Sequence, residues 1–243
     1  MTMTRTLLLT GASRGIGHAT VRRFNNEGWR VITCSRHPFP QECPWGGGAA
    51  NHIQIDLANP NDVIGKVEVI RGMLGGRLDA LVNNAGISPK GPEGGRLNTF
   101  DTDLRTWGHV FHVNFFASVV LARSLRDELA EAKGAVVNVT SIAGGRVHPF
   151  AGAAYATSKA ALAALTREMA HDFGPLGVRV NAIAPGEIRT DILSPGTEEL
   201  ADTIPMRRLG EPREVADTVY FLCTSPSAYI SGTEIEINGA QHV

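Results

Sequence analysis

A tyrosine and a lysine with helical spacing are the residues of this sequence best suited to acid–base chemistry. Tyr155 and Lys159 lie in a run of alanines, leucines and other helix-forming residues that extends to about Phe173. Residues four apart share one face of a helix, so we expect the phenol and the ammonium group to point the same way. A cation beside a phenol favours the phenolate, which predicts that the pKa of Tyr155 falls below its ordinary value of about 10. The pair is therefore a candidate acid–base group for use near neutral pH.

A glycine-rich segment near the N-terminus is a candidate phosphate-binding turn. The short apolar run from Thr6 to Leu9 is followed by Gly11, Gly15 and Gly17, and then by a helical pattern. Between a strand and a helix, such glycines allow a tight turn and a close approach of a ligand, and the helix N-terminus can bind a pyrophosphate. The spacing differs from that of most dinucleotide-binding folds, so an ordinary strand–helix turn is the alternative.

The end of the next expected strand, 31–35, indicates which dinucleotide such a turn would bind. Folds that prefer NAD place a carboxylate here, which binds the ribose 2′-hydroxyl and would repel a 2′-phosphate. Ser35 occupies this position, and Arg36 follows it. Arg36 and Arg14 of the glycine-rich segment could donate charge-assisted hydrogen bonds to a 2′-phosphate. These residues predict NADP(H) as the cofactor, with two merely solvated arginines as the alternative.

Strand-like and helical patterns alternate along the whole chain. The expected strands are 6–9, 31–35, 53–57, 79–82, 135–140, 179–184 and 234–238. The expected helices are about 16–28, 60–74, 103–130 with a break, 155–173 and 212–222. Segment 37–51 has the proline and glycine content of an irregular loop. This alternation predicts one α/β domain over residues 1–243, with a doubly wound parallel sheet of seven strands and helices on both faces.

Small and polar residues stand where several of these strands end. Asn83-Asn84-Ala85-Gly86 follows the fourth strand, Ser141 the fifth, and Pro185-Gly186 the sixth. Open parallel sheets bind ligands at the carboxyl ends of their strands, although turn formation alone also favours such residues. Asn114 differs because it lies inside an apolar helical stretch, where an amide requires hydrogen-bond partners.

Composition limits the classes of partner. The net charge of −1 gives no reason to expect nucleic acid or an anionic membrane as a partner. No apolar run is long enough to span a bilayer, and the N-terminus leads directly into a strand, so we expect a cytoplasmic protein. The three cysteines lack Cys-x-x-Cys spacing, which argues against a disulfide framework and a zinc site, and we expect no metal.

Taken in order, these motifs resemble those of the short-chain dehydrogenase/reductase family, in its compact single-domain branch with a Rossmann fold. The resemblance extends from Thr6 to the C-terminus and depends on six motifs: 10–17, 83–86, Asn114, Ser141, Tyr155 with Lys159, and Pro185-Gly186 followed by Thr190. It implies an enzyme that transfers a hydride between a nicotinamide and a carbonyl or secondary alcohol.

The resemblance also implies a role for each of four catalytic residues. Tyr155 would donate a proton to a substrate carbonyl in reduction, or accept one in oxidation. Lys159 would lower the pKa of Tyr155 and bind the nicotinamide ribose. Ser141 would hydrogen-bond the substrate oxygen. Asn114 would hold a water that connects Lys159 to solvent.

Further residues are expected to contact the cofactor by the same resemblance. Asp56 and Leu57 should lie near the adenine, Ile188 and Thr190 near the nicotinamide carboxamide, and segment 187–210 should form the substrate loop. The full expected set is Gly11, Ser13, Arg14, Gly15, Ile16, Gly17, Ser35, Arg36, Asp56, Leu57, Asn83, Ala85, Gly86, Tyr155, Lys159, Pro185, Gly186, Ile188 and Thr190.

The substrate is less closely defined. Segments 208–212 and 230–232 are similar to those of 3-oxoacyl-thioester reductases, while a small ketone, sugar or polyol is the alternative substrate. Arg146 and His148 could face a small polar or anionic substrate. A third alternative is a nucleotide-binding sensor or scaffold without turnover, which the intact Ser141, Tyr155 and Lys159 disfavour.

Two macromolecular partners are considered. An acyl carrier protein is acidic, and a surface that binds it should be basic. Because Asp127, Glu128 and Glu131 before the fifth strand are acidic, a carrier protein is a possible partner but not a favoured one. The resemblance implies a homotetramer, in which helices 103–130 and 155–173 pair with their symmetry mates. The apolar residues of these two helices support this pairing, because they give more apolar surface than one sheet face can cover.

Overall fold

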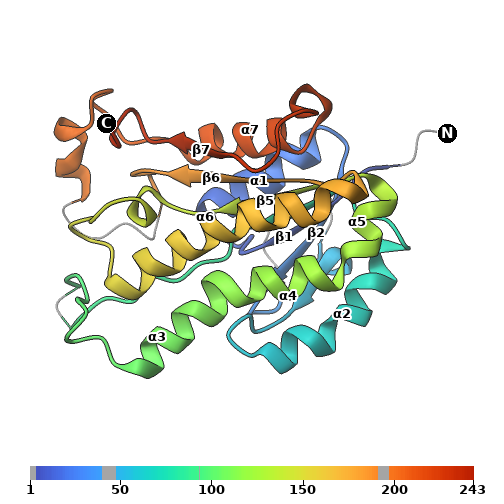
Figure 1. The fold of residues 1–243 in the computed structure, drawn as a ribbon, viewed down its shortest axis with the longest axis horizontal. Coiled ribbons are helices and arrows are strands. Elements are labelled where there is room, and N and C mark those ends of the chain that lie inside the picture. The colour runs from blue at the N-terminus through green and yellow to red at the C-terminus, as the bar shows by residue number, and fades with distance from the viewer. Residues whose placement is uncertain (1–3, 40–47, 93, 191–196) are drawn as a thin grey trace.

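Seven parallel strands form one sheet in the computed structural model, which describes residues 4–39, 48–92, 94–190 and 197–243 (Figure 1). The strand order is β3-β2-β1-β4-β5-β6-β7, so the chain builds outward from β1 in one direction and then in the other. The strands are β1 Thr6–Thr10, β2 Arg30–Ser35, β3 His52–Gln54, β4 Ala80–Asn83, β5 Ala135–Val139, β6 Arg179–Pro185 and β7 Glu234–Ile237. The prediction of a doubly wound Rossmann-type sheet is confirmed.

Helices cover both faces of this sheet. In Figure 1, α2, α4, α5 and α6 lie in front of the strands, and α1 and α7 lie behind them. The helices are α1 Gly15–Asn26, α2 Pro60–Leu74, α3 Leu104–Phe111, α4 Ala117–Ser124, α5 Arg126–Ala132, α6 Ala153–Phe173 and α7 Pro212–Leu222. None of the described helices is both long and apolar enough to cross a lipid bilayer.

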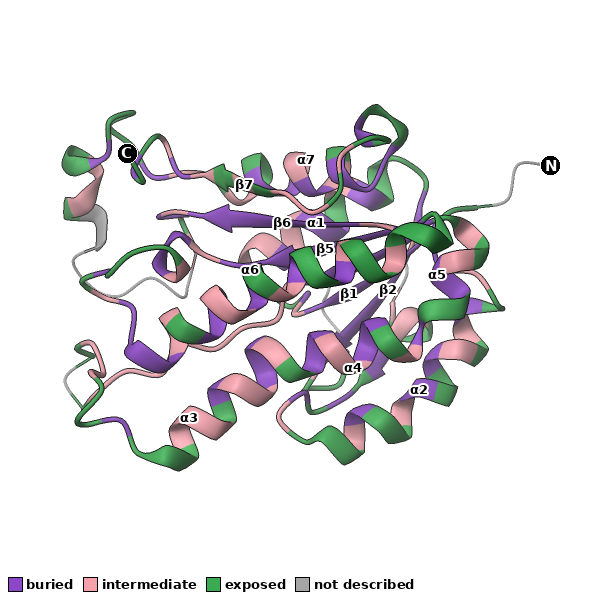
Figure 2. Ribbon diagram, viewed as in Figure 1, coloured by how far each residue is buried: buried purple, intermediate pink, exposed green. Residues whose placement is uncertain are grey.

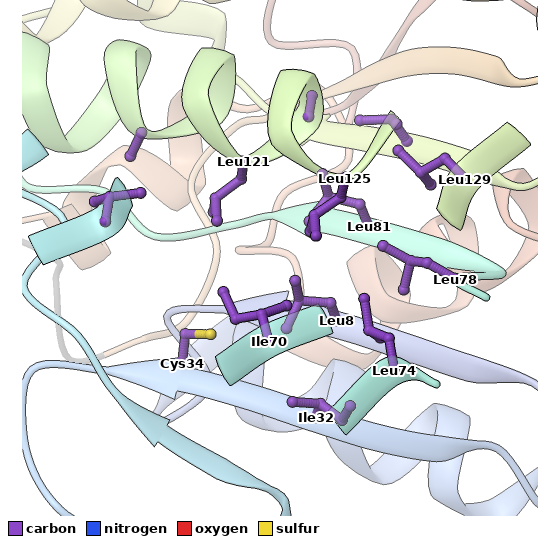
Figure 3. Close-up of a cluster of buried hydrophobic side chains, with 14 of the residues drawn as sticks. Leu8, Ile32, Cys34, Ile70, Leu74, Leu78, Leu81, Leu121, Leu125 and Leu129 are labelled. Carbon is purple, nitrogen blue, oxygen red and sulfur yellow. The ribbon is translucent and has the colours of Figure 1, made fainter. Parts of the chain in front are cut away.

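Alternating side chains of the strands supply two apolar cores. On β1, Leu8 points into a cluster with Ile32, Ile70 and Leu125, all fully or almost fully buried (Figure 3). Leu7 and Leu9 point to the opposite face and join the cluster that contains Phe24 of α1 and Val219 of α7. Figure 2 shows the central strands of the sheet buried between helices whose outer faces are exposed. A strand buried on both faces has no polar side, which explains the unbroken apolar run of β1.

Local capping explains why two helices begin at the expected residues. Asn59 caps α2, because its side chain accepts hydrogen bonds from the backbone N–H groups of Asn61 and Asp62 at 3.0 and 3.3 Å. Glu211 and Glu214 form a capping box at the start of α7. Both caps lie within four residues of the helix start, so the cause of each start is local in the sequence.

Two expected elements differ in the structure. The third strand ends at Gln54 and not at Leu57, because the chain turns where the Asp56 carboxylate accepts a hydrogen bond from the N–H of Ala58 at 3.0 Å. The break expected within the helical segment 103–130 is present, and the structure divides the segment further, into α3, a π-helical turn at His112–Phe116, α4 and α5. In the expected loop 37–51, residues 40–47, which include Cys43, lie outside the described residues.

Candidate active site

A cleft of about 300 Å³ lies at the carboxyl ends of the strands, where β1 and β4 are neighbours and the strand order reverses. Open parallel sheets bind ligands at this position. Every expected cofactor residue except Asn83 lines the cleft. Ser141, Tyr155 and Lys159 line it as well, so most of the expected site residues are brought together by the fold. In the expected substrate loop 187–210, residues 191–196 lie outside the described residues.

The glycine-rich loop is packed too tightly for side chains. Gly11 has a φ of +69°, and a Cβ on Gly17 would lie 2.0 Å from the carbonyl oxygen of Gly11. The Asn84 amide fixes this loop from the side, because its Nδ2 donates to the carbonyl oxygens of Thr10 and Gly11 at 3.0 and 2.8 Å. Asn84 also lines the cleft, although the sequence interpretation singled out its neighbour Asn83 as the contact.

The same loop leaves hydrogen-bond donors for an anionic ligand. Helix α1 begins at Gly15, and Arg14 at its N-cap provides no side-chain hydrogen bond. The first N–H groups of an uncapped helix are suited to a phosphate. A Cβ on Gly15 would lie 3.0 Å from Cγ2 of Thr190, so the cleft narrows here between the glycine-rich loop and the Thr190 side chain. These features fit the pyrophosphate of a dinucleotide.

Two arginines line the cleft, one in the glycine-rich loop and one directly after β2. Arg14 and Arg36 both line it, and within the described part of the chain neither forms an ion pair. Ser35 donates from Oγ to the carbonyl oxygen of His37 at 2.9 Å and lies 3.3 Å from Nε2 of His52. No carboxylate therefore occupies the end of β2, in agreement with the sequence.

Helix α6 presents the acid–base pair to the centre of the cleft. Tyr155 lies in its first turn, and Nζ of Lys159 is 5.7 Å from the centroid of the Tyr155 ring. Lys159 is 3% exposed, and Nζ donates to the carbonyl oxygen of Val139 at 2.6 Å. Ser141 follows β5, and the turn after it packs closely on α6, because a Cβ on Gly144 would lie 2.9 Å from the backbone nitrogen of Ala160. The three side chains are thus held by β5 and α6 together.

Burial, and not the neighbouring cation, determines the direction of the Tyr155 pKa. Desolvation raises this pKa, a hydrogen bond with Ser141 lowers it, and the charge of Glu187 raises it further. Desolvation also lowers the pKa of Lys159 to about 8. The sequence-based expectation of a lowered Tyr155 pKa was therefore wrong for the free protein, because helical spacing does not reveal how deeply the pair is buried.

Asn114 lies behind the cleft in the π-helical turn. Its Oδ1 accepts from the N–H of Ile87 at 2.9 Å, and its Nδ2 donates to the carbonyl oxygen of Ile87 at 3.1 Å and to Oγ of Ser158 at 3.0 Å. A Cβ on Gly86 would lie 3.3 Å from Nζ of Lys159 and 3.6 Å from Oδ1 of Asn114, so both groups face the same backbone position. Asn114 thereby ties the loop after β4 to the catalytic helix.

Asn83 points away from the cleft. Its Nδ2 donates to Oδ1 of Asn138 at 2.8 Å, and Nδ2 of Asn138 donates to Oγ1 of Thr166 at 2.9 Å. All three residues are buried. This chain of hydrogen bonds connects β4, β5 and α6, so Asn83 stabilises the position of the catalytic helix. Alternation along β4 explains the difference, since Asn83 and Asn84 must face opposite ways.

A second buried pair lies near Tyr155 and was not identified as a pair from the sequence. Nε2 of His148 is 2.6 Å from Oε1 of Glu187, and the two side chains are 6% and 9% exposed. Arg146 points elsewhere, because its guanidinium donates to the backbone carbonyl oxygen of Gln241. The two basic residues of this loop therefore do not form a shared anion site. The sequence signal that could have identified Glu187 as a site residue is its position directly after Pro185-Gly186, at the carboxyl end of β6.

The family model described as Enoyl-(Acyl carrier protein) reductase matches residues 11–242 of the chain. Protein FixR of Bradyrhizobium diazoefficiens is 56% identical, over 98% of this chain and 87% of that protein. The 3-oxoacyl-(acyl-carrier-protein) reductase FabG of Aquifex aeolicus is 32% identical, over 96% of this chain and 95% of the reductase.

A solved structure is similar over almost the whole chain. It is an oxidoreductase of the short chain dehydrogenase/reductase family from Brucella ovis, in complex with a partially ordered NAD. It is 56% identical and covers 97% of this chain and 100% of its own, with a TM-score of 0.84.

The packing of the glycine-rich loop gives the first prediction. Gly17→Ala should lower the free energy of unfolding by about 1–3 kcal/mol, because the new methyl group must displace the backbone of Gly11. Gly65→Ala is the matched control, since Gly65 also lies inside a helix but has no atom within 4 Å of its Cβ position. The control should be neutral or gain up to about 1 kcal/mol from helix propensity. Urea unfolding followed by circular dichroism measures both, and equal stability of the two variants would contradict the packing argument.

Proposed function

The chain belongs to the short-chain dehydrogenase/reductase family, and we propose that it is an NADP(H)-dependent oxidoreductase that acts on a carbonyl or secondary alcohol. One observation carries this proposal: Tyr155, Lys159 and Ser141 converge on the centre of a cleft whose other end fits a dinucleotide. When bound, the nicotinamide supplies the hydride chemistry. The chain supplies the proton and the binding contacts.

Tyr155 is suited to act as the acid in carbonyl reduction. Because burial raises its pKa, the phenol keeps its proton at neutral pH and can donate it to a carbonyl oxygen. Ser141 provides a hydroxyl beside the phenol for the same oxygen. Lys159, with a pKa of about 8, remains largely protonated at pH 7 and stabilises the negative charge that develops when the phenol releases its proton. Because Tyr155, Ser141 and Lys159 are all present and close together, a nucleotide-binding sensor that catalyses no reaction is a less favoured function.

Removal of the transferable proton should abolish turnover without unfolding the protein. Tyr155→Phe should lower kcat by at least about 100-fold, because general acid–base catalysis contributes about 10²–10⁴ to a rate. Tyr229→Phe is the matched control, since Tyr229 is fully exposed and should retain wild-type activity. Cofactor binding by fluorescence titration should be similar in all three proteins. A Tyr155→Phe enzyme with near-normal kcat would rule out Tyr155 as the acid.

Residues at the far end of the cleft support NADP(H) over NAD(H). Ser35 replaces the carboxylate that would repel a 2′-phosphate, and the guanidinium groups of Arg14 and Arg36 line the cleft without an ion-pair partner among the described residues. The NAD in the Brucella ovis structure belongs to that protein, and it makes NAD(H) the alternative cofactor here.

Steady-state kinetics with both cofactors test this preference. We expect kcat/KM with NADPH to exceed that with NADH by at least about 100-fold, because each charge-assisted hydrogen bond contributes about 1.5–3 kcal/mol. The double variant Ser35→Asp/Arg36→Leu should reverse the preference mainly through KM, since this end is remote from the chemistry. Equal use of both cofactors by the wild type would mean that the arginines remain in solvent.

The similarity to FabG supports a second substrate class, 3-oxoacyl thioesters. The argument against an acyl carrier protein becomes weaker in the structure. Glu128 is buried and its Oε1 lies 3.2 Å from Nε of Arg71, so it adds nothing to the surface charge. Asp127 is exposed and pairs with Arg126 at 2.8 Å. A carrier protein therefore remains a possible partner within this proposal.

The outer face of α3, the π-helical turn and α4 supports self-association, and the family likeness makes a homotetramer the expected assembly. The rings of Trp107, Phe111 and Phe115 follow one another with centroid distances of 6.3 and 6.1 Å, and Phe116 is 45% exposed. Aromatic side chains left partly exposed on a long helix favour pairing with a second copy.

Light scattering at micromolar concentration should therefore give the mass of a tetramer. Phe116→Asp should shift the mass to a smaller species, because the new charge would be desolvated in the contact. Ile64→Asp, at a 58% exposed position of α2, is the control and should leave the mass unchanged. A monomeric wild type would refute the assembly.

A further inference from the structure

A group of polar side chains stands at the edge of the sheet, beside the turn that carries Arg36. β3 is the outermost strand on this side and pairs in parallel with β2. Ile53 and Cys34 point from these two strands into the apolar core. Because successive side chains of a strand alternate between its faces, the polar residues next to them share the opposite face. They are Thr33, Ser35, His52 and Gln54.

His52 holds the backbone of the turn that follows β2. Its Nε2 lies 2.9 Å from the carbonyl oxygen of His37. A carbonyl oxygen only accepts, so the ring proton is assigned to Nε2, which donates to it. Nδ1 lies 2.8 Å from Oγ1 of Thr33, so contacts at both nitrogens fix the plane of the ring. The hydroxyl of Ser35 donates to the same His37 carbonyl oxygen at 2.9 Å.

Gln54 holds the preceding peptide group of the turn. Its Nε2 donates to the carbonyl oxygen of Arg36 at 3.0 Å. The N–H of Ile55, directly after β3, donates to the carbonyl oxygen of Ser35 at 2.9 Å. Three successive carbonyl oxygens, those of residues 35–37, therefore accept hydrogen bonds from β3 and the residue after it. Fixing these peptide groups fixes the direction in which the side chains of the turn leave the backbone.

The side chains of this turn reach the cleft, and those of β3 do not. Ser35, Arg36 and His37 all line the cleft, and His37 was not among the expected cofactor residues. His52 and Gln54 are not among the lining residues. These two side chains can therefore act on a bound nucleotide only through the turn that they hold.

We propose that His52 and Gln54 are positioning residues for cofactor selection, which hold the 35–37 turn so that Arg36 and His37 are presented to the 2′-phosphate of NADP(H). The inference rests on the proposed function and identifies the part of the fold on which its cofactor preference depends. A long cationic side chain loses conformational entropy when it binds a phosphate. Prior fixing of the backbone that carries the side chain reduces this loss and keeps the charge-assisted hydrogen bond within reach.

Binding of two nucleotides to the free, full-length protein tests the inference without turnover. Adenosine 2′,5′-bisphosphate and adenosine 5′-monophosphate differ only in the 2′-phosphate. By isothermal titration calorimetry, the wild type should bind the bisphosphate at least about 100-fold more tightly than the monophosphate. His52→Leu and Gln54→Met each remove one donor to the turn. Each should lower this ratio by about 10-fold, the equivalent of one charge-assisted hydrogen bond, and leave the affinity for the monophosphate nearly unchanged.

A rescue variant separates positioning from a merely structural role. His52→Gln should keep the wild-type ratio, because the amide nitrogen of glutamine can donate to the His37 carbonyl oxygen in place of Nε2. His171→Leu is the control, since His171 is exposed in the last turn of α6, and it should also keep that ratio. An equal loss of affinity for both nucleotides in His52→Leu would show that His52 only stabilises the fold, and would overturn the inference.

The wild-type ratio distinguishes failure of this inference from failure of the proposed function. Equal binding of the two nucleotides by the wild type would overturn the proposed preference for NADP(H), and this inference with it. A wild type that prefers the bisphosphate, together with an unchanged preference in His52→Leu and Gln54→Met, would overturn the inference alone. Gln54→Met keeps the inference testable if His52→Leu does not fold, because Gln54 is exposed at the sheet edge.

Discussion

The burial of one ammonium group is the constraint on which the site depends. Lys159 is almost fully buried, and removing a cation from water is expensive unless it is hydrogen-bonded. The carbonyl oxygen of Val139, at the end of β5, provides that hydrogen bond at 2.6 Å. The position of α6 relative to β5 is therefore fixed by the same contact that places Tyr155. Gly144 permits the close approach of the turn after β5 to α6. The hydrogen bonds from Asn83 through Asn138 to Thr166 also hold β4, β5 and α6 together.

Sequence reasoning succeeds where the physical cause is local. The ends of α2 and α7 follow from caps within a few residues, and the positions of Gly11 and Gly17 follow from a turn that has no space for a Cβ. Parallel strands with short loops bring their carboxyl ends to one edge, so the expected residues Ser35, Ser141 and Gly186 gather there without further information.

It fails where the cause lies between distant segments. The π-helical turn satisfies Asn114 through Ile87 and Ser158, which are 27 and 44 residues away in sequence. The helical pattern of 103–130 does not predict those contacts. The pKa of Tyr155 is a second example, because spacing predicts the neighbouring cation but only the tertiary structure reveals the burial that outweighs it. The contact between His148 and Glu187 likewise joins two loops after different strands.

Three cationic residues line the cleft, although the chain as a whole is nearly neutral. They are Arg14, Arg36 and Lys159, and Glu187 lies in sequence between the lining residues Gly186 and Ile188. Each buried charge is costly alone, and opposite charges in the same water-poor region reduce that cost. The charge of Glu187 partly offsets the desolvation that lowers the pKa of Lys90, and it also makes the Tyr155 phenolate harder to form. Burial and the charge of Glu187 together thus raise the pKa of Tyr155 and favour its protonated phenol in the free protein.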